Sequence, residues 1–268
     1  RCNSYASINF RTFIVRAIVR GVSDSYEKAL ASYFGTGPTD LEEARKQHSA
    51  YVLKLRELGL TVKELDSHSD YPDCCFVEDH AIVAGDSALI TNAGHDSRLG
   101  EKTAIVEALE DDLNLEFMNS GGRMDGGDVF QFGNKFLVGH SSRTNNRGIQ
   151  NLKDFVEFRG FDLHVIEVPK RSLHLISVCT SPMPDVLLAP EGWFKPSDFP
   201  DDTEILLVPN EEAYGANVIS FGKEVMVSKG YDITSKILID KGLNLHYMEM
   251  SQFRAGDGSL TCLSVIYE

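Results

Sequence analysis

Apolar positions alternate in short runs along the chain, and turns separate these runs at regular intervals. The pattern predicts a strand, a turn and a second strand four times, over residues 76–94, 124–142, 173–192 and 214–230. Helices are predicted after three of these units, over residues 101–113, 146–160 and 232–243, and further strands over 163–169 and 244–250. The units recur every 43 to 49 residues, measured between Asp79, Asp128, His174, Asn217 and Cys262. A repeat of this length favours an array of similar units.

A fifth unit begins at Cys262 and contains one strand, which is expected to start at the cysteine. An apolar run over residues 10–19 predicts a strand near the N-terminus, and this strand can supply the missing partner. Pairing of the two terminal strands would close the array. The predicted fold is therefore α/β, a five-bladed α/β propeller of ββαβ repeats in a single domain over residues 1–268. An ordinary α/β sheet is the alternative arrangement.

A helix is predicted from Thr39 or Asp40 to Gly59, because residues 39–42 resemble a capping box and glycine commonly ends a helix. A short strand over residues 60–65 follows. Residues 21–40 before the helix contain scattered glycine and serine around a short helical piece over 25–34. This part is expected to be a flexible segment near one mouth of the fold.

Composition narrows the class of protein. The 268 residues, 42% of them hydrophobic, can bury a sizeable core. The five cysteines are odd in number and include an adjacent pair, so a reduced, cytoplasmic protein is expected. No apolar run approaches the roughly 20 residues that cross a bilayer, and the N-terminal residues lack a signal-peptide pattern. The net charge of -14 disfavours nucleic acid as a partner and would attract a cationic small molecule.

In a closed propeller the starts of the inner strands would meet at one end of a central channel. This would bring together six polar side chains, those of Glu78, Asp79, Asp125, Asp128, His174 and Cys262. A cysteine and carboxylates in one acidic channel suit attack at the central carbon of a guanidinium, because that carbon is a poor electrophile and the cation must be held. Cys262 would add as a thiolate, favoured when the bound cation lowers the thiol pKa. His174 would protonate the departing amine, with Asp125 orienting its ring, and no metal or organic cofactor is required.

Each candidate also has a structural explanation. A cysteine in an apolar strand is commonly buried, and His174 between two leucines can be a core histidine. The run of residues 125–128 (DGGD) is a good turn sequence, and the acids of residues 78–79 can face water. A zinc site is disfavoured because the chain has no Cys-x-x-Cys pair.

Five ordered motifs resemble the dimethylarginine dimethylaminohydrolases, which belong to the guanidine-modifying, or pentein, superfamily. They are residues 72–79 (PDCCFVED), 125–129 (DGGDV), 142–148 (SRTNNRG), 173–175 (LHL) and 260–265 (LTCLSV). The resemblance covers nearly the whole chain. It implies a five-fold ββαβ propeller and the hydrolysis of N-omega-methylated arginines to citrulline and a methylamine.

The resemblance also implies roles for single residues. It assigns the nucleophile to Cys262, the general acid and base to His174 and the histidine-orienting acid to Asp125. Guanidinium binding is assigned to three carboxylates, those of Asp73, Glu78 and Asp79. Asp128 is counted among the substrate-binding candidates because the repeat brings it to the same cavity.

The remaining implied contacts concern the other end of the substrate. Arg98 and Arg143, which by default are surface arginines, match the residues that hold the substrate carboxylate, a bidentate role for which lysine is a poorer substitute. Leu30 matches the substrate-facing leucine of a mobile lid, so residues 21–40 become a candidate gate. Gly256 lies where a backbone carbonyl would meet the substrate amino group.

Some positions depart from the family pattern. Leu263 follows Cys262, where mammalian members have a second cysteine, and His80 is an unexpected polar residue beside the expected pocket entrance. Arginine deiminase, the nearest rival, has an acid two residues after the histidine, where Ile176 stands here. An apolar wall at that position would suit N-methyl groups better than a bare amino group.

Other functions stay open at this point. A citrulline hydrolase or an amidinotransferase of the same fold is an enzymatic alternative. A non-catalytic five-bladed binding scaffold is the alternative from another class, although such a protein would not need Cys262, His174 and the acids together. The expected partner is a small cationic molecule such as a methylated arginine, with no nucleic acid and no membrane, and the chain is expected to be a monomer or a homodimer.

Overall fold

The computed structural model describes residues 14–201 and 203–268, in which fifteen strands form five three-stranded sheets. We call the sheets blades 1 to 5. Blade 1 consists of β15 (Val265–Tyr267), β1 (Arg16–Arg20) and β2 (Thr61–Leu65), and blade 2 of β3 (Ala81–Ala84), β4 (Ser87–Ile90) and β5 (Asn114–Phe117). Blade 3 consists of β6 (Val129–Phe132), β7 (Lys135–His140) and β8 (Asp162–Glu167), and blade 4 of β9 (Thr180–Met183), β10 (Val186–Pro190) and β11 (Glu204–Val208). Blade 5 consists of β12 (Val218–Phe221), β13 (Glu224–Ser228) and β14 (Asn244–Met248). The first two strands of each blade pair antiparallel and the last two pair parallel.

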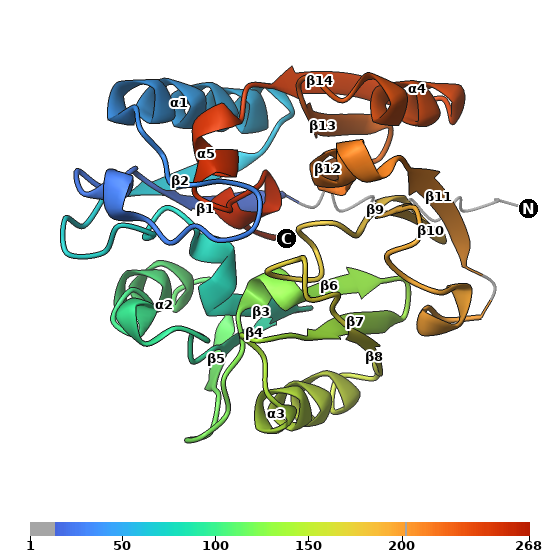
Figure 1. The fold of residues 1–268 in the computed structure, drawn as a ribbon. Helices are drawn as coiled ribbons and strands as arrows, with labels where there is room; N and C mark the ends of the chain where they lie inside the picture. Colours follow the sequence, from blue (N-terminus) through green and yellow to red (C-terminus); the bar gives the residue numbers. More distant parts are fainter. Residues whose placement is uncertain (1–13, 202) are drawn as a thin grey trace, which may run out of the picture.

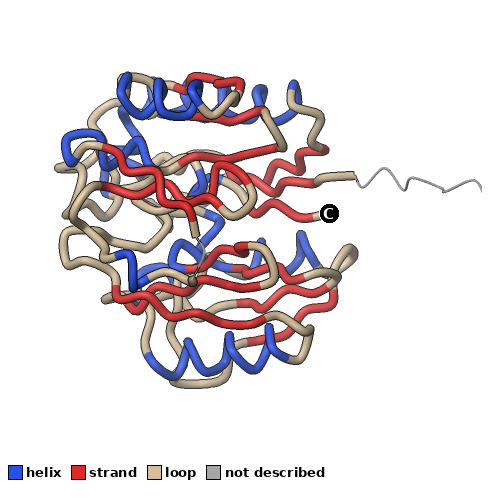
Figure 2. The backbone as a smooth tube through the Cα atoms, turned by 90° about the vertical axis from the view of Figure 1, so that its right-hand side faces the viewer, coloured by secondary structure: helices blue, strands red, loops and turns tan. Residues whose placement is uncertain are grey.

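Helices join the second strand to the third in four blades. They are α1 (Leu41–Glu57), α2 (Thr103–Leu109), α3 (Asn146–Glu157) and α4 (Asp232–Asp240). They lie on the outside, with the strands toward the middle (Figures 1 and 2). As predicted, α1 is capped by Asp40, whose carboxylate accepts a 2.9 Å hydrogen bond from the Glu43 amide, and it ends before Gly59.

The ring of blades closes through the two ends of the described chain. Strand β1 pairs antiparallel with β15, with Ile18 opposite Val265, which confirms the predicted pairing. Ala17 and Val19 belong to a hydrophobic cluster shared with blade 5, whereas Ile18 belongs to the cluster shared with blade 2. Three further clusters lie between blades 2 and 3, 3 and 4, and 4 and 5. Each blade therefore buries both faces against its neighbours, as the five-bladed propeller requires.

Several predicted boundaries were wrong in detail. The strand expected to start at Cys262 starts at Val265, because Thr261–Leu263 form a 3-10 helix. Similar helices, Val77–His80 and Gly126–Asp128, come directly before β3 and β6. The candidate residues there lie in tight turns before the inner strands, where the backbone amides are not used by a sheet.

Other differences lie outside the repeats' first strands. Only Tyr26–Lys28 is helical within the predicted helix 25–34, and residues 10–13 of the first predicted strand are outside the described residues. Pro182 is part of β9, and Pro184 lies in the turn between β9 and β10. Strands β5 and β11 and the short helix α5 (Ser251–Ala255) had not been predicted.

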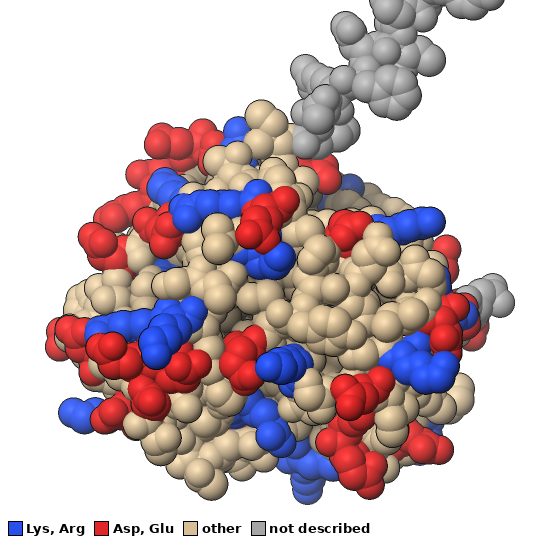
Figure 3. Space-filling view, turned by 90° about the horizontal axis from the view of Figure 1, so that it is seen from above, with Lys and Arg blue, Asp and Glu red and all other residues tan. Residues whose placement is uncertain are grey.

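Within the described residues, none of the helices is long and apolar enough to cross a membrane. Basic side chains are interspersed among the acidic ones on the face seen from the side of α1 and α4 (Figure 3). Although the net charge is -14, the acidic side chains do not form one continuous patch on this face.

Candidate active site

A cavity of about 20 Å³ lies where the turns before the inner strands meet. Eight of the eleven predicted site residues line it, namely Leu30, Asp73, Asp79, Arg98, Arg143, His174, Gly256 and Cys262. Glu78, Asp125 and Asp128 are not among its lining residues. Phe76, Leu173, Asp257 and Gly258 also line it, and they had not been singled out as site residues from the sequence.

His174 and Asp125 form a buried pair beside this cavity. The His174 Nε2 atom lies 3.0 Å from Asp125 Oδ2, and Asp125 Oδ1 accepts a 2.6 Å hydrogen bond from the Gly94 amide. Burial alone would lower the pKa of His174, but the charge of Asp79 and the bond to Asp125 raise it to about 9. Burial would raise the pKa of Asp125, but its bond to His174 holds it below the usual range. At neutral pH the pair is an imidazolium and a carboxylate.

The Cys262 thiol is 4% exposed and lies 3.3 Å from the Ser259 hydroxyl. Burial raises its pKa well above the ordinary value, and the charges of Glu78 and Asp79 raise it further. In the absence of a bound cation the group is therefore a thiol. A cation placed among these carboxylates would remove the electrostatic part of this effect.

Three carboxyl groups were assigned to guanidinium binding, and their partners differ. Asp79 accepts a 2.9 Å hydrogen bond from the Gly127 amide and a 2.5 Å bond from Arg98 Nη1. Glu78 has a buried oxygen, Oε2, for which the described part of the chain offers no hydrogen-bond partner. Burial and the charge of Asp79 raise the pKa of Glu78 well above its ordinary value. Burial likewise raises the pKa of Asp73 to about 6, and its carboxylate accepts from the Leu30 amide at 3.1 Å.

The two arginines differ in how many of their donors are in use. The buried Arg98 guanidinium donates to Asp79, to Glu101 at 2.8 Å and to the Phe76 carbonyl at 2.9 Å. Arg143 makes one longer side-chain contact, 3.3 Å to Asp125, and its side chain is 14% exposed. Arg143 therefore has donors to offer a ligand, whereas Arg98 chiefly neutralises acids of the protein.

His80 and Asp128 serve the protein's own structure. His80 is buried, and its Nε2 lies 2.8 Å from Glu101; it does not line the cavity beside which it had been expected. Asp128 accepts hydrogen bonds from the Leu175 amide at 2.9 Å and from two hydroxyls, those of Ser141 and Thr144. Its oxygens thus tie the residues after His174 to the end of β7.

Two glycines allow the turns to approach one another. A Cβ atom on Gly126 would lie 2.0 Å from the Glu78 carbonyl oxygen. A Cβ atom on Gly127 would lie 2.6 Å from His174 Nδ1. The predicted turn sequence therefore has a second role, because any larger residue would push apart the groups that surround the cavity.

Ile176 is buried, but it is not among the residues that line the cavity. Its amide donates to the Gly127 carbonyl and its carbonyl accepts from the Asn217 side chain. The apolar wall expected from this residue is therefore not part of the cavity lining.

Asp79, Asp125 and His174 are also the described residues that could ligate a cation, since one ligand atom from each lies within 4.8 Å of the others. Both carboxylates already pair with an arginine, Asp79 with Arg98 and Asp125 with Arg143. A metal ion would have to compete with these two guanidinium groups.

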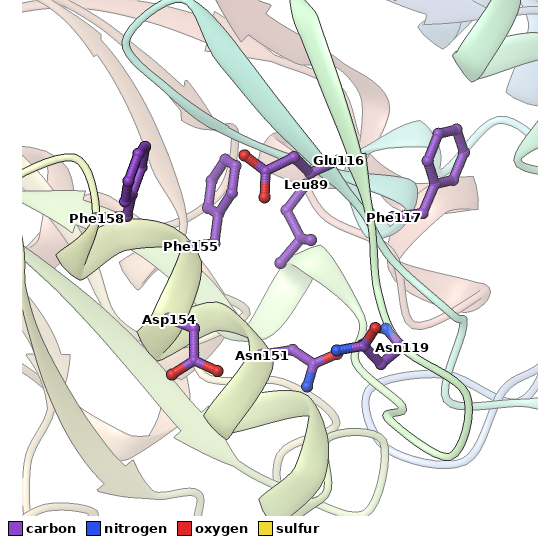
Figure 4. Close-up of a pocket in the computed structure, with 8 residues that line it drawn as sticks. All are labelled: Leu89, Glu116, Phe117, Asn119, Asn151, Asp154, Phe155 and Phe158. Carbon is purple, nitrogen blue, oxygen red and sulfur yellow. The ribbon is translucent and has the colours of Figure 1, made fainter.

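A larger cavity, of about 400 Å³, lies between α3 and the end of β5 (Figure 4). Its lining residues are Leu89, Glu116, Phe117, Asn119, Asn151, Asp154, Phe155 and Phe158. They include no cysteine and no histidine, so of these two cavities in the described part of the chain the smaller one holds the nucleophile and base of the predicted chemistry.

Comparison with known proteins identifies the family. A family model described as N,N dimethylarginine dimethylhydrolase, eukaryotic, matches residues 24–188. The chain is 32% identical to the N(G),N(G)-dimethylarginine dimethylaminohydrolase of Streptomyces coelicolor over 254 residues, which cover 93% of this chain and 96% of the relative. The chain belongs to the dimethylarginine dimethylaminohydrolase family. Proteins so named are hydrolases that act on a carbon–nitrogen bond, and the resemblance predicted from the sequence motifs is confirmed.

Solved structures of this family have the same fold. The chain is 29% identical to the dimethylarginine dimethylaminohydrolase from Pseudomonas aeruginosa, a mutant of which was solved in complex with citrulline; the TM-score is 0.89 over 95% of this chain and 100% of that one. The N-terminal domain of ArgZ, an arginine dihydrolase from cyanobacteria, is 15% identical, with a TM-score of 0.84 over 95% of this chain and 97% of that one. At 15% identity the likeness shows the fold alone. The predicted five-fold arrangement is thus shared by the family and by more distant proteins.

Proposed function

We propose that the chain is a cysteine hydrolase that converts asymmetric dimethylarginine and monomethylarginine to citrulline and a methylamine through a covalent S-alkylthiouronium intermediate. One observation carries the proposal: the Cys262 thiol shares a single small cavity with the His174 imidazolium and with the carboxylates of Asp73 and Asp79. A nucleophile, a proton donor and anions that hold a cation are the groups that attack on a guanidinium needs.

The substrate guanidinium would bind between Asp79 and Glu78, whose unpartnered Oε2 would accept one of its N–H groups. This contact would also remove the cost of burying an unsatisfied acceptor. The free donors of Arg143 would hold the substrate carboxylate, the Gly256 carbonyl would receive its amino group, and Asp73 would be a further carboxylate for the guanidinium. Asp128 is assigned to holding the segment around His174, because protein donors already occupy both its oxygens.

In the first step the bound cation lowers the pKa of Cys262, the thiol gives its proton to solvent, and the thiolate sulfur forms a bond to the central guanidinium carbon. His174 gives its proton to the nitrogen that carries the methyl groups. The carbon–nitrogen bond then breaks, and the neutral methylamine leaves. The product of this step is an S-alkylthiouronium on Cys262, and His174 is left neutral.

In the second step the neutral His174 accepts a proton from water, whose oxygen attacks the same carbon. The carbon–sulfur bond breaks, the remaining proton of the adduct passes to the sulfur, and citrulline is released with Cys262 as thiol and His174 as imidazolium. Asp125 stabilises this imidazolium in both steps and fixes the ring orientation through its 3.0 Å contact.

The described cysteines, Cys74, Cys75, Cys179 and Cys262, all carry free and buried thiols. Free thiols support a reducing compartment such as the cytoplasm as the site of action.

A panel of dimethylarginine, monomethylarginine, arginine and citrulline tests the proposal, with citrulline, methylamines and ammonia measured as products. Faster release from the methylated arginines than from arginine is expected. Faster release of ammonia from arginine would make the protein a deiminase, ammonia release from citrulline would make it a citrulline hydrolase, and no turnover of any of the four would overturn the enzyme assignment.

A further inference from the structure

Residues 30–37, which we call the lid segment, cover one side of the cavity. Leu30 lines the cavity, and the Gly37 amide donates a 2.9 Å hydrogen bond to the Ala255 carbonyl. A Cβ atom on Gly35 would lie 2.2 Å from the same carbonyl oxygen, so the two backbones are in direct contact. In Figure 1 this part of the chain, in blue before α1, runs beside α5.

The carboxylate of Asp257 is the main polar anchor of the lid segment. Its oxygens accept hydrogen bonds from four consecutive backbone amides, including those of Tyr33 at 2.9 Å, Phe34 at 2.7 Å and Gly35 at 3.1 Å. The fourth donor is the Ser32 amide. Consecutive amides that point at one anion form a nest, and hydrogen bonds to an ionised acceptor are stronger than neutral ones.

Asp257 is 5% exposed and lines the cavity, and its backbone has a φ of 58°, which is uncommon for a residue other than glycine. In the described residues no lysine or arginine forms an ion pair with it, so the lid amides provide its charge compensation. If the lid segment moved away, this carboxylate would lose all four donors at once.

The cavity is too small for the proposed substrate in this conformation. A volume of about 20 Å³ has room for about one water molecule, whereas an arginine-sized molecule needs several times more. The lid segment must therefore open for binding, and opening has to break the bonds to Asp257.

The lid segment also contacts, through Phe34 and Tyr214, the segment that leads to Cys262. Phe34 of the lid packs edge-on against the Tyr214 ring, with centroids 5.3 Å apart, and the Tyr214 hydroxyl donates a 2.9 Å hydrogen bond to the Gly258 carbonyl. Asp257 and Gly258 come a few residues before Cys262 in the chain. Closure of the lid segment thus orders the backbone next to the nucleophile.

We propose that Asp257 is a positioning residue that latches the lid segment over the bound substrate and so places Leu30 and the loop before Cys262 for reaction. The assignment of the substrate as a methylated arginine rests on the proposed function, whereas the latch itself does not depend on it. Asp257 acts through the lid backbone and takes no part in bond making.

Hydrogen exchange of the free protein tests the latch directly. Asp257→Asn replaces one acceptor oxygen by a donor, so amides 32–35 should exchange at least about tenfold faster than in the unaltered protein, with little change elsewhere. Glu212→Gln is the matched control, because Glu212 accepts from the Ile233 and Thr234 amides at the start of α4. It should affect those amides only. Unchanged protection of amides 32–35 in Asp257→Asn would overturn the proposal.

Kinetics separate the latch from the chemistry. With dimethylarginine, Asp257→Asn should lower kcat/KM about tenfold, while Glu212→Gln leaves it unchanged. An unchanged kcat/KM in Asp257→Asn would contradict a latch. If the protein does not turn over dimethylarginine but amides 32–35 lose protection, the proposed function fails and the latch stands.

A second variant acts from the lid side in case Asp257→Asn does not fold. Gly35→Ala places a methyl group against the Ala255 carbonyl and leaves Asp257 unchanged. Faster exchange confined to the lid segment supports the latch. Full protection of amides 32–35 in this variant would contradict it.

Discussion

The His174 Nε2 atom lies 3.0 Å from Asp125 Oδ2, and the two side chains come from turns that are 49 residues apart in the chain. Both are buried, at 3% and 0% exposure. The pair stays charged there because Asp79 and Arg143 balance it from either side, so His174 is a proton donor at neutral pH. The first step of the proposed reaction depends on that proton.

The charge on His174 predicts a pH dependence of stability. Its folded-state pKa of about 9 is higher than the ordinary 6.5, so its contribution is full below about pH 6.5 and is lost as the pH rises through 9. The shift corresponds to on the order of 3 kcal/mol. Urea unfolding of the unaltered protein and of His174→Gln should give free energies of unfolding whose difference shrinks between pH 7 and 10. A constant difference would show that the histidine is neutral in the folded protein.

Asp125→Asn should lower kcat by roughly 100-fold or more, because the imidazolium loses its stabilising charge. The pH above which kcat/KM declines should also move down, since the pKa of His174 falls. Glu224→Gln is the matched control: Glu224 lies 2.6 Å from His246 Nε2 at the surface of blade 5, and this change should leave activity unaltered. A pH profile of Asp125→Asn identical to that of the unaltered protein would contradict the assigned role.

Replacing the two arginines by alanine should affect different properties, substrate binding for Arg143 and stability for Arg98. Arg143→Ala should raise KM for substrates that bear a free carboxylate by about tenfold or more, with little effect on agmatine-like amines that lack it. Arg98→Ala should lower the free energy of unfolding by about 3–5 kcal/mol, because the buried Asp79 and Glu101 would lose their counter-charge. Substrate panels and urea unfolding measure the two effects. Equal loss of both substrate classes in Arg143→Ala would show that it does not recognise the carboxylate.

Gly127→Ala should reduce kcat about 100-fold while the protein stays folded, because the added methyl group would displace His174 by a large part of an ångström. Gly133→Ala serves as the control. Gly133 has a φ of 58° in the turn between β6 and β7, with open space around it, so its replacement should cost stability and leave kcat intact. Normal activity of Gly127→Ala would mean that the close approach at His174 is not needed.

The overall fold could be predicted because each repeat has a recognisable local pattern of apolar and polar residues. Alternating apolar residues mark most strands of the blades. The apolar runs around Ile18 and Val265 were the two that still needed a partner strand, so they were expected to pair with each other. Strand β5 was missed because its sequence NLEF is only four residues long and is largely exposed, so its alternation is too short to mark a strand. Cys262 was placed on a strand because residues 263–267 alternate, although the preceding turn closes as a 3-10 helix.

The site could be predicted only as a set of residue types. Which oxygen meets which donor depends on contacts between distant segments, and no local pattern encodes these. Asp128 looked like a cavity acid because it stands at a repeat start, but its oxygens point to Leu175, Ser141 and Thr144. The role of Asp257 was likewise hidden, since its partners lie about 225 residues earlier in the chain.

Turnover of dimethylarginine by the unaltered protein and by Cys262→Ser tests whether Cys262 is the nucleophile of a dimethylarginine hydrolase. Citrulline and dimethylamine are measured together, and circular dichroism shows that both proteins are folded. Equimolar citrulline and dimethylamine are expected from the unaltered protein, and no detectable product is expected from Cys262→Ser. Retained turnover in Cys262→Ser, or no turnover by the unaltered protein, would contradict this assignment.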